Sequence, residues 1–252
     1  MEKFELRTRQ QFAALIAKRD HWARIQSEPS AKERFERLIG LGWACENCAL
    51  DTLSDPMSWH AEVLDESRTQ QLQGHMAASQ ALLRLVNERE FLSSENLLEL
   101  HGAMLSGAGP RAGIFRQKEC KPLADGHEPT HVELVRAVVD NSLEWFQSDS
   151  FAEMHEVERT GLMLVKLIDI HPFDEGGGRT LRLFSNFSLL KAGYPPAVIP
   201  ASRASQYAIA IQNSLRFHTQ PIIDLIAEGV EHSLAHCLDE PLPSPKLNVL
   251  PA

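Results

Sequence analysis

Apolar side chains recur every three or four residues along most of the chain, the spacing that places them on one face of an α-helix. This periodicity predicts helices in the first half of the chain over residues 12–25, 31–50, 68–87 and 94–105. It predicts further helices over 132–147, 155–170, 179–192, 204–215 and 220–238. Residues 114–130 interrupt the helical pattern, and their Lys121-Pro122 and Asp125-Gly126 pairs suit a short β-hairpin or an extended flap. The predicted fold class is therefore mainly α.

Composition narrows the class of protein. The chain has 252 residues, of which 43% are hydrophobic and 23% charged, as in ordinary globular proteins. A formal net charge of −9 argues against nucleic acid as a partner, because a nucleic-acid binder needs a concentrated basic surface. No apolar run is long enough to predict a membrane span, and the first residues lack the apolar core of a signal peptide. We therefore expect a cytoplasmic protein, with secretion as an effector as the open alternative.

Four cysteines are too few for a disulfide scaffold. Cys45 and Cys48 form a Cys-x-x-Cys pair, which occurs in redox and zinc sites. No second pair of ligands follows at the spacing of a zinc finger, and residues three apart also share one face of a helix. A structural role for both cysteines is the favoured interpretation.

The segment from His171 to Arg182, His-Pro-Phe-Asp-Glu-Gly-Gly-Gly-Arg-Thr-Leu-Arg, holds the candidate chemistry. Backbone N–H groups of three successive glycines can curl around an anion. Arginines at 179 and 182 share one face of a helix and can clamp the same phosphates. Glu175 is a hard oxygen donor that suits Mg²⁺, and a histidine can accept a proton near neutral pH. The combination points to a polyphosphate site.

This segment resembles the signature of Fic-domain enzymes, His-x-Phe-x-Asp/Glu-Gly-Asn-Gly-Arg-x-x-Arg. The similarity continues through Leu183-Phe-Ser-Asn-Phe-Ser-Leu-Leu-Lys-Ala-Gly-Tyr-Pro-Pro196 and includes upstream marks at 97–101 and 113–116. It covers roughly residues 75–235, so it implies a Fic-type helical bundle with a β-hairpin flap. We predict a catalytic core over 75–238 after an N-terminal helical region (1–74), with a proline-rich tail over 239–252.

The resemblance implies a protein adenylyltransferase, which moves AMP from ATP to a Ser, Thr or Tyr hydroxyl of a target protein. His171 is then the base, and Glu175 holds Mg²⁺ on the α- and β-phosphates. The glycine amides form the anion hole, and the two arginines clamp the β- and γ-phosphates. Asn186 corresponds to a family position near the nucleoside, whereas Asp174 occupies a variable position and Phe173 anchors the loop. The phosphate-binding set is Gly176, Gly177, Gly178, Arg179 and Arg182.

Gly177 departs from the family pattern, which has Asn there. Glycine keeps the backbone N–H but lacks the side-chain amide that helps to hold the phosphates. A lost hydrogen bond to a charged group costs roughly 1.5–3 kcal/mol, so a slower enzyme or a different donor is expected.

An inhibitory helix is also implied. Many Fic proteins carry Ser/Thr-x-x-x-Glu-Gly/Asn, whose Glu pairs with the second motif arginine and repels the γ-phosphate. Here the segment 42–47 keeps Glu46-Asn47 but has Gly42 in place of Ser or Thr. The hypothesis is that Glu46 pairs with Arg182 and represses transfer. An exposed helical Glu is the alternative.

Four further points stay open at this stage. The activity can be altered to another nucleotide, phosphate or phosphocholine donor, or to removal of AMP. A catalytically impaired nucleotide-binding or regulatory module is the third interpretation, which the intact His171, Glu175, Arg179 and Arg182 argue against. The flap, near 119–130, is expected to align a target segment by backbone pairing, with His127 and His131 as surface histidines. Exposed helical faces are compatible with a homodimer.

Overall fold

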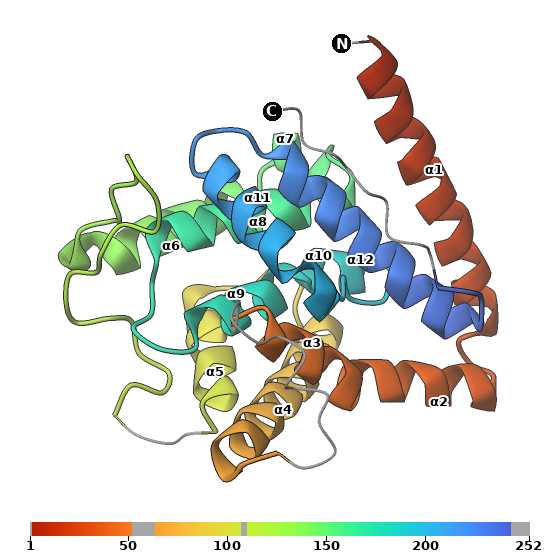
Figure 1. Ribbon diagram of the computed structural model, residues 1–252, viewed down its shortest axis with the longest axis horizontal. Helices are drawn as coiled ribbons and strands as arrows, with labels where there is room; N and C mark the ends of the chain where they lie inside the picture. Colours follow the sequence, from red (N-terminus) through yellow and green to blue (C-terminus); the bar gives the residue numbers. More distant parts are fainter. Residues whose placement is uncertain (1, 52–63, 107–109, 243–252) are drawn as a thin grey trace.

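The computed structural model describes residues 2–51, 64–106 and 110–242, without the side chains of residues 2–9. In the described part of the chain the structure is built from α-helices and short 3₁₀ and π turns (Figure 1). The longer helices are α1 (Glu2–Ile25), α2 (Pro29–Arg37), α4 (Glu66–Glu88), α5 (Ser94–Met104), α6 (Val135–Trp145), α8 (Glu156–Ile170), α9 (Gly177–Ser185), α11 (Ala204–Ser214) and α12 (Gln220–Leu238). The shorter elements are η1 (Leu38–Gly42), α3 (Trp43–Ala49), η3 (Val132–Leu134), α7 (Asp149–Ala152), α10 (Phe187–Lys191) and η4 (Ala201–Arg203). The prediction of a mainly α fold is confirmed.

Several helices begin where the sequence provides a cap. Ser93 precedes α5 and forms a capping box with Asn96, so the first amides of the helix are satisfied. Asp65 caps α4 by accepting from the N–H of Arg68, and the imidazole of His155 caps α8 in the same way for Val157. These local signals explain why the predicted starts of the helices agree closely with the structure.

Helix α8 lies at the centre of the bundle. Its apolar face is buried, including Leu164 and Leu167, and it packs against α9, α12, α10 and α6. Helices α4 and α5 form a close pair against α9. Their approach depends on Gly74, because a Cβ at this position would lie 2.2 Å from the carbonyl oxygen of Met104. The closing of the bundle around α8 and α9 positions the segment that joins them.

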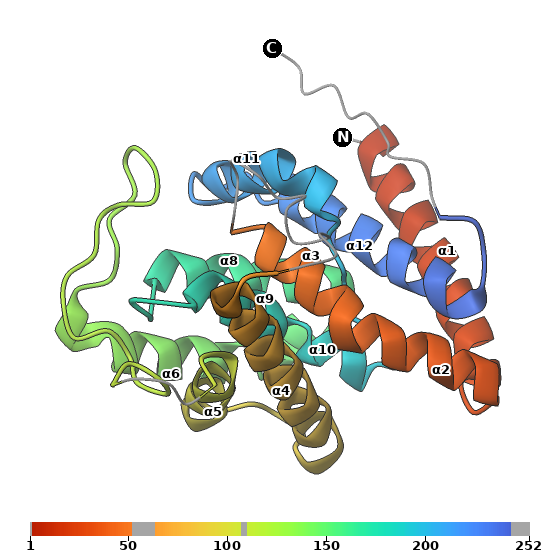
Figure 2. The same cartoon turned by 60° about the horizontal axis from the view of Figure 1, so that its bottom comes forward.

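The N-terminal helices pack onto the same core. Helix α1 lies along α12 in both views, and α3 contacts α4 and α9 (Figures 1 and 2). One continuous cluster of buried apolar residues runs from Leu15 to Leu238. The predicted helix over 31–50 is in fact α2, η1 and α3, because the backbone leaves the helical region at Gly40 (φ −79°, ψ −118°). This kink turns α3 toward the motif segment.

The expected β-hairpin flap is wrong for the described residues of this segment, since the structure assigns no strand to residues 110–131. The segment runs along one side of the bundle, away from α1 and α12 (Figure 2). It is closed by a side chain: the guanidinium of Arg116 donates to the carbonyls of Lys118 and Thr130. These carbonyls therefore need no partner across a strand ladder. Within the described residues, no helix is long and apolar enough to cross a bilayer.

We predict that Gly74→Ala destabilises the protein while Gly102→Ala does not. The added methyl at position 74 meets backbone atoms of Met104, so α4 and α5 must separate, at a cost of about 1–3 kcal/mol of unfolding free energy. The added methyl at position 102 meets nothing closer than 3.6 Å, and Ala is the better helix former by ~1 kcal/mol. Urea denaturation of both variants tests this, and equal stability of the two would contradict the close α4–α5 contact.

Candidate active site

The motif segment joins the C-terminus of α8 to the N-terminus of α9. His171 ends α8 in the left-handed region (φ 52°), with its N–H still bonded to the carbonyls of Leu167 and Ile168. A non-glycine residue held at positive φ is strained, and such strain concentrates at functional sites. Gly176 is also left-handed (φ 66°) and precedes the first turn of α9. The two reversals place the side chain of His171 and the first turn of α9 against one cavity.

Buried aromatic and imidazole rings hold the turn between these two residues. The ring of Phe173 is buried and stacks on His101 with 3.8 Å between centroids. His101 accepts from the N–H of Gly113 at Nδ1, so its Nε2 carries the proton and donates to the carbonyl of Glu175 at 2.8 Å. The expectation that Phe173 anchors the loop agrees with this packing. The role of His101 was not predicted from the sequence.

Arg116 holds the other side of the turn. This buried guanidinium donates to the carbonyl of His171 at 2.7 Å, and its backbone N–H donates to the carbonyl of Pro172 at 2.9 Å. Burial lowers the pKa of His171, and the charge of Arg116 lowers it further. The imidazole is therefore neutral at neutral pH, as a general base must be.

The two motif arginines are buried and face α3. Arg182 donates to the side chain and the backbone carbonyl of Asn47, and its Nη2 lies 2.7 Å from the carboxylate of Asp51. Its guanidinium also lies 5.3 Å from the ring centre of Tyr207. Arg179 donates to Gln71, and its Nε lies 3.7 Å from Asp51 with no hydrogen-bond partner. The carboxylate of Asp51 thus forms ion pairs with both arginines.

Asn47 connects α3, α4 and α9. Its amide nitrogen donates to the carbonyl of Arg179 at 3.1 Å and lies 2.7 Å from Nε2 of His75. Burial lowers the pKa of His75 to about 3, and the charges of Arg182 and Arg179 add to the shift. His75 is therefore neutral and can accept from Asn47 at Nε2.

A cavity of about 400 Å³ opens beside these groups. His171, Gly177, Gly178 and Arg182 line it together with Asp51, and apolar residues of α8, α9 and α11 form its walls. Glu175 and Arg179 instead line a neighbouring polar cavity of about 440 Å³ with the glutamines of α4. His171, Glu175, Arg179 and Arg182 are thus brought to the two sides of one glycine turn.

Comparisons with known proteins agree with this geometry. Residues 91–189 match the model of the Fic/DOC family. The match covers less than half of the chain.

Curated relatives are similar to a longer part of the chain than the family model is. The chain is 30% identical over 151 residues to "Protein adenylyltransferase Fic" of Aedes aegypti, and 32% identical over 151 residues to the protein of the same name from Drosophila ananassae. Each alignment covers 60% of this chain and 30% of the relative. The chain therefore spans less than a third of the length of these relatives.

Solved structures share the fold over almost the whole chain. Fic-1 (aa134–508) from C. elegans superposes with a TM-score of 0.79 at 19% identity, covering 94% of this chain and 74% of that one. A Fic domain containing signaling protein from Bacteroides thetaiotaomicron superposes with a TM-score of 0.74 at 17% identity, covering 93% of this chain and 99% of that one. At these identities the likeness concerns the fold alone. It includes the helices before residue 91.

Two predicted site residues, Glu46 and Asn186, make other contacts than those expected from the sequence. Glu46 does not form the expected pair with Arg182, since its carboxylate accepts from the backbone N–H of Ala201. The guanidinium of Arg182 is instead bound by Asn47 and Asp51. Asn186 is also satisfied internally, donating to the carbonyl of Arg182 and accepting from the N–H of Ala197, both at 2.7 Å. It fixes the junction of α9 and α10 and is not among the residues that line the cavity.

The structure also shows the surroundings of the two histidines near the flap and of the Cys-x-x-Cys pair. His127 is buried, contrary to the prediction of a surface residue, and accepts from the N–H of Leu123 at 3.0 Å. His131 is exposed and lies 2.9 Å from a carboxylate oxygen of Glu119. The cysteines of the Cys-x-x-Cys pair are free, buried thiols whose pKa values are raised by burial. Raised thiol pKa values and burial agree with a structural role.

The buried His75 predicts how the stability of the domain depends on pH. In the folded protein the pKa of His75 is about 3, below its unfolded value of 6.5. Its contribution to the free energy of unfolding is therefore fully present above pH 6.5 and is lost as the pH falls toward 3. Between pH 7 and pH 5 the wild type should lose about 2 kcal/mol more unfolding free energy than His75→Gln. Urea denaturation at the two pH values measures this difference. Equal losses in both proteins would show that His75 is protonated in the folded state.

Proposed function

We propose that the chain transfers AMP from ATP to a hydroxyl side chain of a target protein, with His171 as the base. The names of the curated relatives and the half-buried, neutral imidazole support this activity. One observation carries the proposal: the protein already holds an anion, the carboxylate of Asp51, between the two motif arginines and the glycine turn.

The position of Asp51 defines the anion site. Its carboxylate lies 2.7 Å from Nη2 of Arg182 and 3.7 Å from Nε of Arg179. A Cβ placed on Gly178 would come within 2.9 Å of the same carboxylate, so the oxygen rests directly against the first turn of α9. Positive charge, the helix N-terminus and close backbone approach are what a phosphate group requires. The carboxylate oxygens stand in for phosphate oxygens at this place.

The reaction follows from the placement of His171 in the same cavity. The hydroxyl oxygen of the target attacks the α-phosphorus of ATP, the new P–O bond forms, and the bond to the β-phosphate breaks. The proton of the hydroxyl passes to the imidazole of His171, and pyrophosphate leaves. Arg179, Arg182 and the amides of the glycine turn stabilise the charge on the leaving group. Arg116 fixes the backbone from which the imidazole extends, because it donates to the carbonyl of His171.

A magnesium ion fits this arrangement through Glu175. The side chain of Glu175 is exposed beside the glycine turn and forms no ion pair with another described residue. No three His, Cys, Asp or Glu residues among the described ones come together to hold a metal, so protein ligands alone do not make the site. Mg²⁺ commonly uses one carboxylate and the oxygens of the substrate phosphates. When bound, it neutralises phosphate charge as pyrophosphate departs.

The same anion site suggests a form of control by the segment that follows α3. While the carboxylate of Asp51 lies on both arginines, a β- or γ-phosphate cannot reach them. Asn47 holds the backbone of this segment in place through Arg182 and Arg179. The inhibitory contact predicted for Glu46 is thus assigned to Asp51, and nucleotide must displace this carboxylate to bind productively.

Intact-mass spectrometry after incubation with Mg²⁺ and ATP tests the activity and its control. Asp51→Ala should gain the mass of one AMP on itself or on an added target hydroxyl, because its arginines are free. The wild type should gain less, and Asp51→Ala/His171→Ala should gain none. Glu153→Ala, which removes an exposed carboxylate at the end of α7 that lines neither cavity, serves as the matched control and should behave as the wild type. Equal gain of AMP in Asp51→Ala and Asp51→Ala/His171→Ala would contradict the role of His171 as the base.

Gly177 generates a second prediction. Its φ is not in the left-handed region, and a Cβ would meet Phe173 at 3.4 Å, so the Asn of the family signature fits without moving the backbone. Gly177→Asn in the Asp51→Ala background should increase the rate of AMP transfer about ten- to a hundred-fold, since one hydrogen bond to a charged phosphate is added. Initial rates at saturating ATP measure the effect. An unchanged rate would mean that Gly177 suits a different donor, which UTP, GTP and CDP-choline would reveal.

A further inference from the structure

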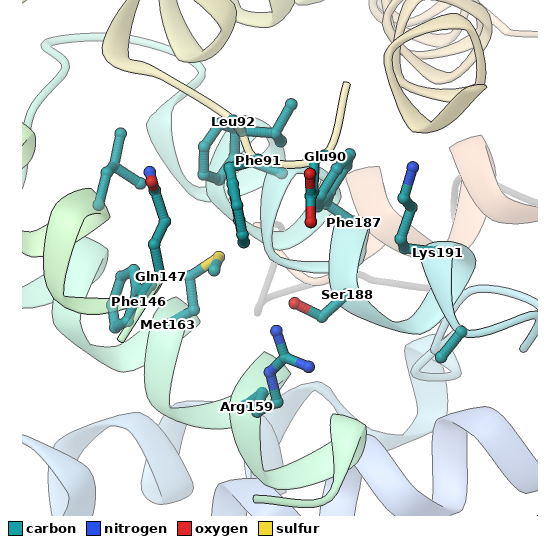
Figure 3. Close-up of a pocket in the computed structure, with 13 residues that line it drawn as sticks. Glu90, Phe91, Leu92, Phe146, Gln147, Arg159, Met163, Phe187, Ser188 and Lys191 are labelled. Atoms are coloured by element: carbon teal, nitrogen blue, oxygen red, sulfur yellow. The ribbon is translucent and has the colours of Figure 1, made fainter. Parts of the chain in front are cut away.

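A second cavity lies at the other ends of the helices that form the nucleotide site. It has a volume of about 160 Å³ and opens between the turn that follows α4 and helices α6, α8 and α10 (Figure 3). Six of the residues that line it are apolar and buried or nearly so: Leu92, Leu143, Phe146, Met163, Phe184 and Phe187. Helix α8 contributes its first half here and ends at His171. Helix α9 begins at the glycine turn and ends near this cavity.

Arg159 brings an unpaired positive charge into these apolar surroundings. Its guanidinium lies 5.4 Å from the ring centre of Phe151, and its Nε is buried without a hydrogen-bond partner. It forms no ion pair with any residue that the structure describes. In Figure 3 the guanidinium points into the cavity beside the hydroxyl of Ser188, which donates to no described residue either. The side chain of Arg159 is partly exposed, but its Nε is a buried donor without a partner, and an anionic ligand would satisfy this donor.

The other charged groups at the cavity define what the ligand must be. Lys191 donates to the carbonyls of Val86 and Arg89 at 3.0 and 2.8 Å, so its ammonium is bound at the end of α4. Glu90 is exposed at the rim and disfavours ligands with more than one negative charge. Gln147 also lines the cavity, but its amide is neutral, so among the described lining residues Arg159 has the one positive charge that is not already bound. The ligand must therefore combine one negative charge with a compact apolar body.

We propose that this cavity binds a small monocarboxylate of about the size of one aromatic ring. An apolar cavity of about 150 Å³ in another protein accommodates benzene, so the volume here holds a single ring. The carboxylate accepts two parallel hydrogen bonds from Arg159 and one from the hydroxyl of Ser188. The ring packs against Phe146, Met163 and Phe187. This site is separate from the proposed nucleotide site and does not depend on it.

Isothermal titration calorimetry of the full chain with benzoate tests the proposal, and benzamide is the uncharged comparison. Benzoate should bind at least about tenfold more tightly than benzamide, because only the carboxylate pairs with the guanidinium. Arg159→Met should remove this preference. Arg136→Met is the matched control: this exposed arginine pairs with Glu95 outside the cavity, and its loss should leave the affinity unchanged.

A second variant keeps the test decisive if Arg159→Met does not fold. Ala192 lines the cavity, and Ala192→Leu should fill it and abolish binding of benzoate while circular dichroism shows a folded protein. Asp51→Ala should leave benzoate affinity unchanged, which separates this cavity from the phosphate site. Equal affinities for benzoate and benzamide, unaltered binding in Ala192→Leu, or no binding at millimolar benzoate would each overturn the proposal.

Discussion

Two buried cations of α9 determine how the rest of the structure is arranged. Arg179 and Arg182 are each less than a tenth exposed, and charges buried to this extent must be paired and hydrogen-bonded. Most of the partners come from α3 and the short segment after it, namely Asn47 and Asp51, and Gln71 of α4 accepts from Arg179. This requirement explains why helices from the first fifth of the chain pack against the motif segment. His75 is neutral mainly because it is buried, and the two positive charges of the arginines lower its pKa further.

The same arrangement provides the chemistry. A protein that must stabilise two neighbouring cations with a carboxylate has also built a site for a phosphate, since both anions present oxygens to the guanidinium groups. The glycine turn allows that anion to approach the backbone, and the left-handed conformation of His171 turns the imidazole into the same cavity. Stability and inhibition are therefore linked: the contact that satisfies the arginines in the free protein is the contact that ATP has to replace.

Much of the fold could be predicted from the sequence because the helices are amphipathic and several carry their own caps, such as Ser93 for α5. The kink at Gly40 could not, because the apolar period continues through it. The β-hairpin prediction was wrong because it considered turn residues alone, whereas the side chain of Arg116 closes that segment from within.

Within the site, the contiguous motif was readable from the chemistry of its residues and from its resemblance to Fic enzymes. The partners that come from other helices were not. Glu46 and Asp51 are both acidic and lie in one segment, and only the rotation of α3 after the kink decides which of them reaches Arg182. Similarly, Asn186 shares a helix face with Arg182, but its amide is used by the backbone of α9 and by Ala197. Long-range hydrogen bonds of this kind leave no periodic signal in a sequence.

The claim that Asp51 occupies a phosphate position is tested most directly by pyrophosphate binding in the presence of Mg²⁺, measured calorimetrically for the wild type and Asp51→Ala. The account predicts that removal of the carboxylate tightens binding by about tenfold or more, and that Asp51→Ala/Arg182→Gln loses this gain. Equal or weaker binding by Asp51→Ala would contradict it, since Asp51 would then not compete with phosphate for the two arginines.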